Sequence, residues 1–153
     1  MSVKPIPDGY HTITPYLIVD GGAAALDFYA RAFGAKELMR MPGPGGKVGH
    51  AEIEIGDSRL MLADEHPEMG AVGPKTVGGV CSGLILYVED CDAVFNRAVA
   101  AGAMVERPLA DQFYGDRSGT IIDPFGHKWT IGTHKEDLTP EEIGRRAAAM
   151  GMG

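Results

Sequence analysis

The feature that most constrains this chain is an internal repeat. A run rich in β-forming residues at 12–19 is followed by a stretch of helical apolar spacing at 23–33. The same order returns downstream, with a strand pattern at 83–88 and a helical pattern at 92–101. Because element order, spacing and turn positions agree in the two halves, we predict a duplicated α+β fold and favour it over the alternative of a chance strand-helix pair.

Each half of the repeat closes its helix with glycine and ends in a hairpin. Gly34 and Gly102 follow the helical stretches, where a left-handed residue commonly ends a helix. Short turns at Gly56-Asp57 and at 123–126 then separate pairs of β-rich segments. The predicted strand pairs are 51–55 with 58–63 and 119–122 with 127–131.

These patterns predict two tandem βαβββ half-units, at about 10–65 and 80–134, in a single domain over 1–137. A repeat of this kind resembles a known plan, named below, whose half-units form curved mixed sheets around a ligand cleft. The linker between them, at about 64–81, is rich in Gly and Pro and is expected to be mobile. The tail at 138–153 is expected to be helical from Pro140, because Thr139 is a good N-cap and proline is favoured at the first helical position.

Composition excludes several classes of protein. The net charge of -7, with 14 scattered basic residues, argues against nucleic-acid binding. The two cysteines, Cys81 and Cys91, are too few for a disulfide framework or a four-cysteine metal site. No apolar run reaches the ~20 residues that a membrane span needs, and residues 1–10 lack a signal-peptide pattern. We therefore expect a cytoplasmic protein that does not bind membranes.

Several short motifs between residues 10 and 134 are shared with one known superfamily. They are Val19-Asp20, Asp27-Phe-Tyr, Phe33-Gly-Ala and the turn Asp123-Pro-Phe-Gly-His. By these motifs the chain resembles the vicinal oxygen chelate superfamily of glyoxalase and bleomycin-resistance proteins. Three further segments resemble its PhnB-like subgroup, at 50–57, 61–65 and 114–119. The resemblance implies a homodimer, in which half-units can be swapped, and a small-molecule ligand.

Metal-using members of this superfamily hold their ion with side chains on the first and last strand of each half-unit. Alignment to this sequence places Thr14, Met61, Gly83 and Thr130 at those positions. None is an imidazole, carboxylate or thiolate, the groups that divalent ions prefer. We therefore expect no cofactor and no metal at the usual site, which leaves only a nonstandard site for a divalent ion. Glyoxalase I and extradiol dioxygenase activities are disfavoured, and Thr14, Met61 and Thr130 are expected to contact a ligand.

Strand alternation predicts a polar face in the first half-unit. If Met61 faces the ligand, a two-residue turn at Gly56-Asp57 places Glu52 opposite Met61 and Glu54 opposite Arg59. The resulting face carries His50, Glu52, Glu54, Arg59, Met61, Thr14 and Tyr16. In one interpretation His50 and Glu52 are a catalytic proton-transfer pair, and Tyr16 and Arg59 bind the ligand beside them. In the other this is a solvated strand face, on which Glu54 pairs with Arg59.

A second group of candidate residues lies in the other half. Phe113 and Tyr114 offer aromatic surface, and Asp116 and Arg117 are charged neighbours. Arginine binds carboxylates and phosphates well, so these four residues are predicted to bind the ligand. The alternative is that Asp116 caps a turn and Arg117 forms a structural ion pair.

The sequence leaves three functions open. The first is binding of a small polar metabolite with metal-independent proton transfer, in a lyase or an isomerase. The second is noncatalytic sequestration of a drug, as in bleomycin-resistance proteins, which the acidic composition favours. The third is metal-dependent lyase or dioxygenase chemistry with nonstandard ligands.

Overall fold

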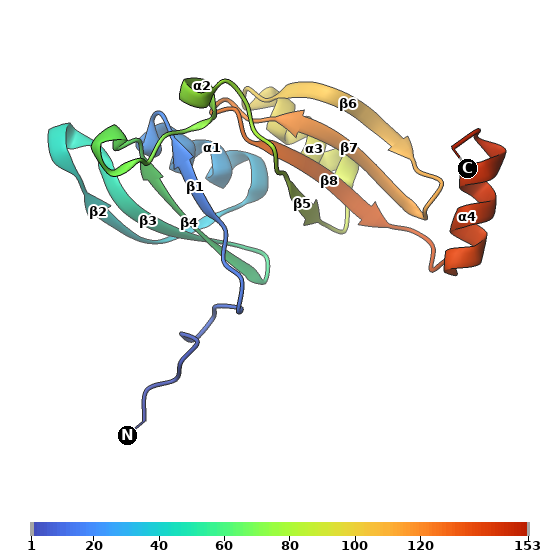
Figure 1. Cartoon of the computed structure of the whole chain (residues 1–153), viewed down its shortest axis with the longest axis horizontal. Coiled ribbons are helices and arrows are strands. Elements are labelled where there is room, and N and C mark those ends of the chain that lie inside the picture. Colours follow the sequence, from blue (N-terminus) through green and yellow to red (C-terminus); the bar gives the residue numbers. More distant parts are fainter. Residues whose placement is uncertain (1, 153) are drawn as a thin grey trace. The chain divides into compact units, whose positions relative to one another are not determined.

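A computed structural model of the chain describes residues 2–152 and divides into two compact units (Figure 1). The N-terminal unit comprises the chain up to Cys81 together with Pro124–His127. The C-terminal unit comprises Ser82–Asp123 and the chain from Lys128 onwards. The predicted duplication is confirmed, because each unit contains one four-stranded mixed sheet with a helix against it.

The sheet of the N-terminal unit has the strand order β1-β4-β3-β2. β1 runs parallel to β4, and the other neighbours are antiparallel. The elements are β1 (Tyr16–Val19), α1 (Gly22–Phe33), β2 (Lys36–Pro42), β3 (Val48–Ile55) and β4 (Ser58–Asp64). The predicted turn at Gly56-Asp57 is confirmed, since Ile55 pairs with Ser58.

Alternating burial along the strands defines the two faces of this sheet. Ala51, Ile53 and Ile55 of β3 are buried on the face that α1 covers, as are Leu60 and Leu62 of β4. Residues between them point to the opposite face, because successive strand side chains alternate. The polar residues of β3 therefore all lie on the face away from α1.

The core of the N-terminal unit is aromatic. Phe28 and Tyr29 of α1 are almost fully buried, and Phe33 stacks on Tyr29 with ring centroids 5.9 Å apart. Phe125, from the turn before the last strand, packs against both Phe28 and Tyr29 at 6.2 Å. In the same turn His127 donates from Nε2 to the carbonyl of Ile18 at 2.8 Å. A segment from the second sequence repeat thus completes this core.

Helix α1 ends as the sequence predicts. Gly34 adopts a left-handed conformation with φ of 69° and donates its backbone N–H to the carbonyl of Ala30. Only glycine reaches that region without strain, which explains why the helix stops there.

The segment between the repeats is more regular than its composition suggests. It contains the 3-10 helix η2 (Pro67–Met69), a β-bridge between His66 and Ala71, and the short helix α2 (Pro74–Val77). Pro74 is buried, and the backbone N–H of Gly73 donates to the Glu65 carboxylate at 2.7 Å. These contacts hold the linker against the N-terminal unit.

The C-terminal unit repeats the plan, with the strand order β5-β8-β7-β6. Trp129 and Ile131 of β8 and Ile121 of β7 are buried, and helix α3 contacts β6, β7 and β8. The elements are β5 (Leu84–Tyr87), α3 (Cys91–Ala100), β6 (Met104–Asp111), β7 (Asp116–Ile122) and β8 (Lys128–His134). β6 has no clear sequence signal, since Pro108 and charged residues interrupt its apolar pattern.

The predicted C-terminal helix is present as α4 (Pro140–Ala149). The Thr139 hydroxyl caps it by accepting the backbone N–H of Glu142 at 3.2 Å. Arg146 forks onto Glu136, with both N–O distances 3.0 Å, and so ties α4 to the preceding segment. No helix within residues 2–152 is long and apolar enough to span a membrane.

Candidate functional site

A row of side chains crosses the polar face of the N-terminal sheet from β1 to β2. Tyr16 pairs with Met61, Met61 with Glu52, and Glu52 with Met39. His50 lies two residues before Glu52 and therefore shares its face, where Met41 is its partner on β2. The register predicted from the sequence, Glu52 opposite Met61 and Glu54 opposite Arg59, is confirmed. The structure thus brings Tyr16, His50, Glu52 and Met61 together.

A continuous hydrogen-bond chain runs through this face. The Tyr16 hydroxyl lies 2.8 Å from Nδ1 of His50. The other imidazole nitrogen, Nε2, lies 2.9 Å from Oε2 of Glu52. The remaining oxygen of Glu52 accepts a hydrogen bond from the Tyr10 hydroxyl. A phenol, an imidazole, a carboxylate and a second phenol are therefore linked in series.

The protonation states of this chain follow from its contacts. The hydrogen bond from Tyr10 lowers the pKa of Glu52, and the one from His50 adds to the effect, so Glu52 is an ionised acceptor. Nε2 of His50 must then carry the proton that it shares with Glu52. In neutral His50 this leaves Nδ1 as an acceptor for the Tyr16 hydroxyl. Burial, with the nearby Glu52 charge, raises the pKa of Tyr16, which keeps the phenol protonated.

An N-terminal turn closes one end of the polar face. Arg59 donates to Glu54 at 3.2 Å and to the backbone carbonyl of Asp8 at 3.0 Å. Its guanidinium also lies over the Tyr10 ring, 5.1 Å from the centroid. Burial raises the pKa of Tyr10 to about 12, with the hydrogen bond to Glu52 contributing in the same direction. The Arg59–Glu54 pair thus has a structural task, which is to hold Tyr10 beside Glu52.

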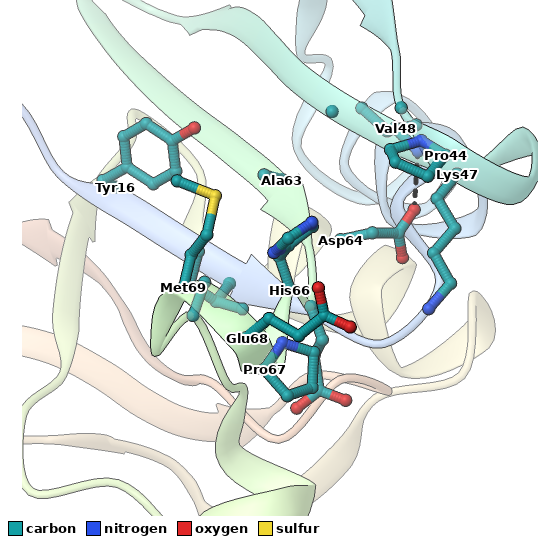
Figure 2. Close-up of a pocket in the computed structure, with 15 residues that line it drawn as sticks. Tyr16, Pro44, Lys47, Val48, Ala63, Asp64, His66, Pro67, Glu68 and Met69 are labelled. Atoms are coloured by element: carbon teal, nitrogen blue, oxygen red, sulfur yellow. Dashed lines mark hydrogen bonds between the residues drawn. The ribbon is translucent and has the colours of Figure 1, made fainter.

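A cavity of about 480 Å³ adjoins this hydrogen-bond chain and shares Tyr16 with it (Figure 2). Ile18 and Ala63 contribute apolar surface from the same sheet face, and the residues after β4 form another wall. Figure 2 shows the His66 ring among these side chains. The complete lining is Tyr16, Ile18, Gly43, Pro44, Lys47, Val48, Gly49, Ala63, Asp64, Glu65, His66, Pro67, Glu68, Met69 and Ala71. The volume suits a small-molecule ligand.

Asp64 connects three elements around the cavity through its hydrogen bonds. Its Oδ1 accepts the backbone N–H groups of Gly21 and Gly22, both at 2.8 Å, at the start of α1. Its Oδ2 accepts the backbone N–H of Val48 at 2.8 Å, at the start of β3. Burial raises the pKa of Asp64, but these three hydrogen bonds outweigh it and lower the pKa overall. A Cβ on Gly22 would lie 2.8 Å from Asp64 Oδ2, so only glycine fits this approach.

The second group of predicted residues lies in the C-terminal unit. Arg117 forks onto Asp92 of α3 at 2.8 and 3.0 Å, an ion pair of the kind anticipated as the alternative to ligand binding. Asp116 is buried and accepts from the Tyr87 hydroxyl and from Nδ1 of His134, both at 2.7 Å. The remaining members are Phe113 and Tyr114 in the turn before β7 and Thr130 on β8, whose hydroxyl lies 3.0 Å from that of Thr120.

The donor set at the expected metal positions does not suit a divalent ion. Met61 lies on the polar face beside Tyr16, whereas Thr14 precedes β1 and lies 3.5 Å from the carbonyl of His11. Gly83 immediately precedes β5 and has no side chain to offer. Among residues 2–152, no three His, Cys, Asp or Glu side chains are grouped in a way that could hold a metal.

Two parts of this site escaped the sequence analysis. Tyr10 precedes the first strand in a segment without periodicity, and its only signal was an aromatic residue among prolines and glycines. His66 and its neighbours belong to the linker, whose composition indicated mobility. Tyr10 joins the hydrogen-bond chain at Glu52, and His66 lines the cavity, only because these loops fold back over the sheet.

Comparisons with known proteins agree with this fold. A sequence model described as "Glyoxalase/Bleomycin resistance protein/Dioxygenase superfamily" matches residues 10–131. The uncharacterized protein Mb0911c of Mycobacterium bovis is 42% identical over 144 residues, which span 92% of this chain and 95% of that protein. The anthracycline biosynthesis protein DnrV of Streptomyces peucetius is 34% identical over 116 residues, which span 75% of this chain and 38% of DnrV.

The crystal structure of TioX from Micromonospora sp. ML1 is similar over most of its length. It matches with a TM-score of 0.63 and 28% identity, covering 84% of this chain and 100% of TioX. The family match covers well over half of the sequence, and the two sheets have the same strand order in the two repeats. The chain belongs to the glyoxalase/bleomycin resistance protein/dioxygenase superfamily.

Proposed function

We propose that this protein binds a small polar metabolite in the cavity of the N-terminal unit and catalyses a proton transfer through Tyr16, His50 and Glu52. The observation that carries the proposal is the unbroken hydrogen-bond chain from Tyr16, which lines the cavity, to the ionised Glu52. A base that is oriented by a carboxylate is a common arrangement in acid–base catalysis.

The geometry supports a two-proton relay. A ligand C–H or O–H group beside Tyr16 gives its proton to the phenol oxygen, while the Tyr16 hydroxyl proton passes to Nδ1 of His50. The products are a ligand anion and an imidazolium ion, which the Glu52 carboxylate stabilises. Tyr16 is neutral before and after the step, in keeping with its raised pKa. Return of the proton to a different atom of the ligand anion gives isomerase chemistry. If the anion instead expels a leaving group with its bonding electrons, the relay returns the proton to that group and the result is lyase chemistry; neither course needs a metal.

The relay is testable by deuterium incorporation into a panel of carbonyl metabolites in D2O, followed by mass spectrometry. We expect Tyr16→Phe and His50→Gln each to slow exchange by about 100-fold, the lower range for general acid–base catalysis. Tyr87→Phe is the matched control, because Tyr87 binds Asp116 in the other unit. Equal rates in all three variants would rule out the relay.

We propose that the reaction needs no metal because of the residues at the superfamily's metal positions. Those residues are Thr14, Met61, Gly83 and Thr130, and none is an imidazole, carboxylate or thiolate. Metal-stripped protein can be incubated with Ni, Zn, Mn or Fe, dialysed, and assayed for bound ion. We expect substoichiometric binding. Tight stoichiometric binding of any one ion would refute the proposal that the reaction needs no metal. It would not affect the proposal that the ligand binds in the cavity.

Sequestration of a drug without catalysis is the second candidate function. The net charge of -7 favours cationic compounds, and a 34% identical relative is an anthracycline biosynthesis protein. The melting temperature of the protein, measured with bleomycin-like drugs and with a panel of metabolites, separates the two candidate functions. A compound that binds only the native protein raises the melting temperature of the protein. A response to drugs alone supports sequestration.

We also propose that the protein assembles as a homodimer. The support is that β1 and β2, and likewise β5 and β6, are edge strands of their sheets, and exposed edges favour pairing or coverage. Light scattering measures the mass directly. A variant ending after Lys135 shows whether α4 contributes to assembly.

A further inference from the structure

The chain before β1 meets the polar face of the N-terminal sheet through a tight turn, residues 7–10, which we call the strap. The backbone N–H of Tyr10 donates to the carbonyl of Pro7 at 3.0 Å and closes the turn. Gly9 has φ of 82°, a conformation that favours glycine at the third position of such a turn. Residues 2–9 are exposed, and Figure 1 shows the chain before β1 extending away from the sheet toward the N-terminus.

Arg59 is the residue on which the strap docks. Its Nη1 donates to the carbonyl of Asp8 at 3.0 Å, and its guanidinium lies over the Tyr10 ring. A Cβ on Gly9 would overlap Cζ of Arg59, so the guanidinium also packs directly against the Gly9 backbone. Glu54 accepts from Nε of the same side chain at 3.2 Å and holds it in place. The turn and the guanidinium therefore fit together only while residue 9 has no side chain.

The docked strap adds one hydroxyl to the hydrogen-bond chain. The Tyr10 hydroxyl donates to Oε1 of Glu52, while Oε2 lies 2.9 Å from Nε2 of His50. Each carboxylate oxygen thus has its own partner, and Glu52 is held against the imidazole. Without Tyr10, Glu52 would keep one partner and turn toward water more often, because fixing its three rotatable bonds costs conformational entropy.

Few contacts hold the strap in its docked position. Within residues 2–10, the polar contacts with the sheet are made by two of its side chains, Arg59 and Glu52. The ion pair between Lys4 and Asp8 lies inside the segment and is exposed. A segment with so few contacts opens locally at a low free energy. The strap can therefore leave Arg59 while the sheet stays folded.

We infer that the strap regulates the proton relay by positioning Glu52. Docked on Arg59, it holds the carboxylate where it stabilises the His50 imidazolium ion that the relay forms. Undocked, it leaves Glu52 free to turn away, and the relay slows. Neither Tyr10 nor Arg59 lines the cavity, so ligand binding is unaffected. Tyr10 is then a positioning residue that acts through Glu52, and the inference rests on the proposed function, whose reaction it regulates.

Gly9→Ala tests the strap without changing a side chain of the relay. The added Cβ overlaps the Arg59 guanidinium and strains the left-handed backbone, so the strap should undock. Gly78→Ala is the matched control, because Gly78 has a similar φ of 92° but nothing lies within 4 Å of its Cβ. Tyr10→Phe is the third variant and removes only the hydroxyl that reaches Glu52.

Two measurements follow the strap and the reaction separately. The first is the pKa of Glu52 from carbon-13 NMR of its carboxyl group, which the Tyr10 hydrogen bond lowers and which should rise alike in Gly9→Ala and Tyr10→Phe. The second is deuterium incorporation into the carbonyl metabolite that the parent protein exchanges fastest in D2O. We expect both variants to lower kcat about tenfold, the effect of one hydrogen bond to a charged group, with KM unchanged. Gly78→Ala should match the parent in both measurements.

The outcomes separate this inference from the proposed function. If Glu52 in Gly9→Ala keeps the pKa of the parent, the strap does not hold Tyr10 on Glu52. If Gly9→Ala keeps the kcat of the parent, the strap does not regulate the reaction. Either result overturns the inference and leaves the proposed function in place, as does an equal loss of kcat in Gly78→Ala or a change confined to KM. If the parent exchanges none of the metabolites, the proposed function fails and the inference fails with it.

Discussion

Replacing Asp64 by Asn tests how much the hydrogen bonds of this carboxylate, which lines the cavity, stabilise the fold. The carboxylate connects the end of β4 to the first residues of α1 and β3 through three hydrogen bonds of 2.8 Å. Asparagine offers one acceptor oxygen and an NH2 group. Its oxygen can keep Gly21 and Gly22 as partners, but its NH2 group then faces the N–H of Val48, donor against donor.

The magnitude follows from these contacts. A hydrogen bond to a charged group contributes about 1.5–3 kcal/mol and a neutral one about 1 kcal/mol. In Asp64→Asn the bonds from Gly21 and Gly22 change from charged to neutral, and the bond from Val48 is lost. Because Asp64 is partly exposed, water recovers some of this loss, and we expect the free energy of unfolding to fall by about 2 kcal/mol. For a chain of this size that corresponds to a melting temperature lower by about 6 °C.

Urea unfolding and thermal melting measure this change, and Asp20→Asn is the matched control. Asp20 is exposed next to the same helix terminus, so it loses the same charge without losing the three backbone contacts. Equal destabilisation of both variants would show that the charge, and not the hydrogen bonds, stabilises the fold. A loss below about 0.5 kcal/mol for Asp64→Asn, the size of an ordinary surface substitution, would refute the reasoning.

The pH dependence of Asp64→Asn provides a second check. The pKa of Asp64 is lowered in the folded protein, so its stabilisation is present above the unfolded pKa of about 3.9 and is lost as pH falls through the lower folded value. The difference between parent and variant should therefore be constant from neutral pH down to about 5 and shrink below about 4. A difference that persists at lower pH would show that the carboxylate is not the source.

Three further predictions concern the two polar clusters and the C-terminal helix. Tyr10→Phe removes the hydrogen bond that contributes most to the lowered pKa of Glu52, so that pKa should rise in an NMR titration; an unchanged value would show that Tyr10 does not position Glu52. Asp116→Asn should lower the pKa of His134, which its hydrogen-bonded carboxylate partners raise. The stabilisation from His134 is present below its unfolded pKa and lost as pH rises through the folded value, so the variant should lose stability mainly on the acid side; an identical His134 titration would count against this. Arg146→Gln breaks the fork that ties down α4, so the amides of α4 should exchange faster than in the parent while those of β7 and β8 do not; unchanged protection of α4 would contradict it.

The sequence by itself determined the regular part of this protein. Hydrophobic periodicity and the residues of turns and helix caps can be recognised within a short stretch of sequence. The two strand-helix units, the end of α1 at Gly34 and the capped helix α4 could therefore be predicted. The two-residue turn at Gly56-Asp57 also fixed which β3 residues oppose Arg59 and Met61. That register placed His50 and Glu52 on one face, because a strand alternates strictly between its two sides.

The tertiary structure decided everything that depends on coil and loop paths. Tyr10 reaches Glu52 across 42 residues of sequence, and the turn with Phe125 and His127 packs into the N-terminal unit from the other repeat. The linker that composition marked as mobile supplies His66 and Glu68 to the cavity wall. Such segments have no periodicity to reveal which way a side chain points. Their positions come from long-range contacts that only the folded chain can make.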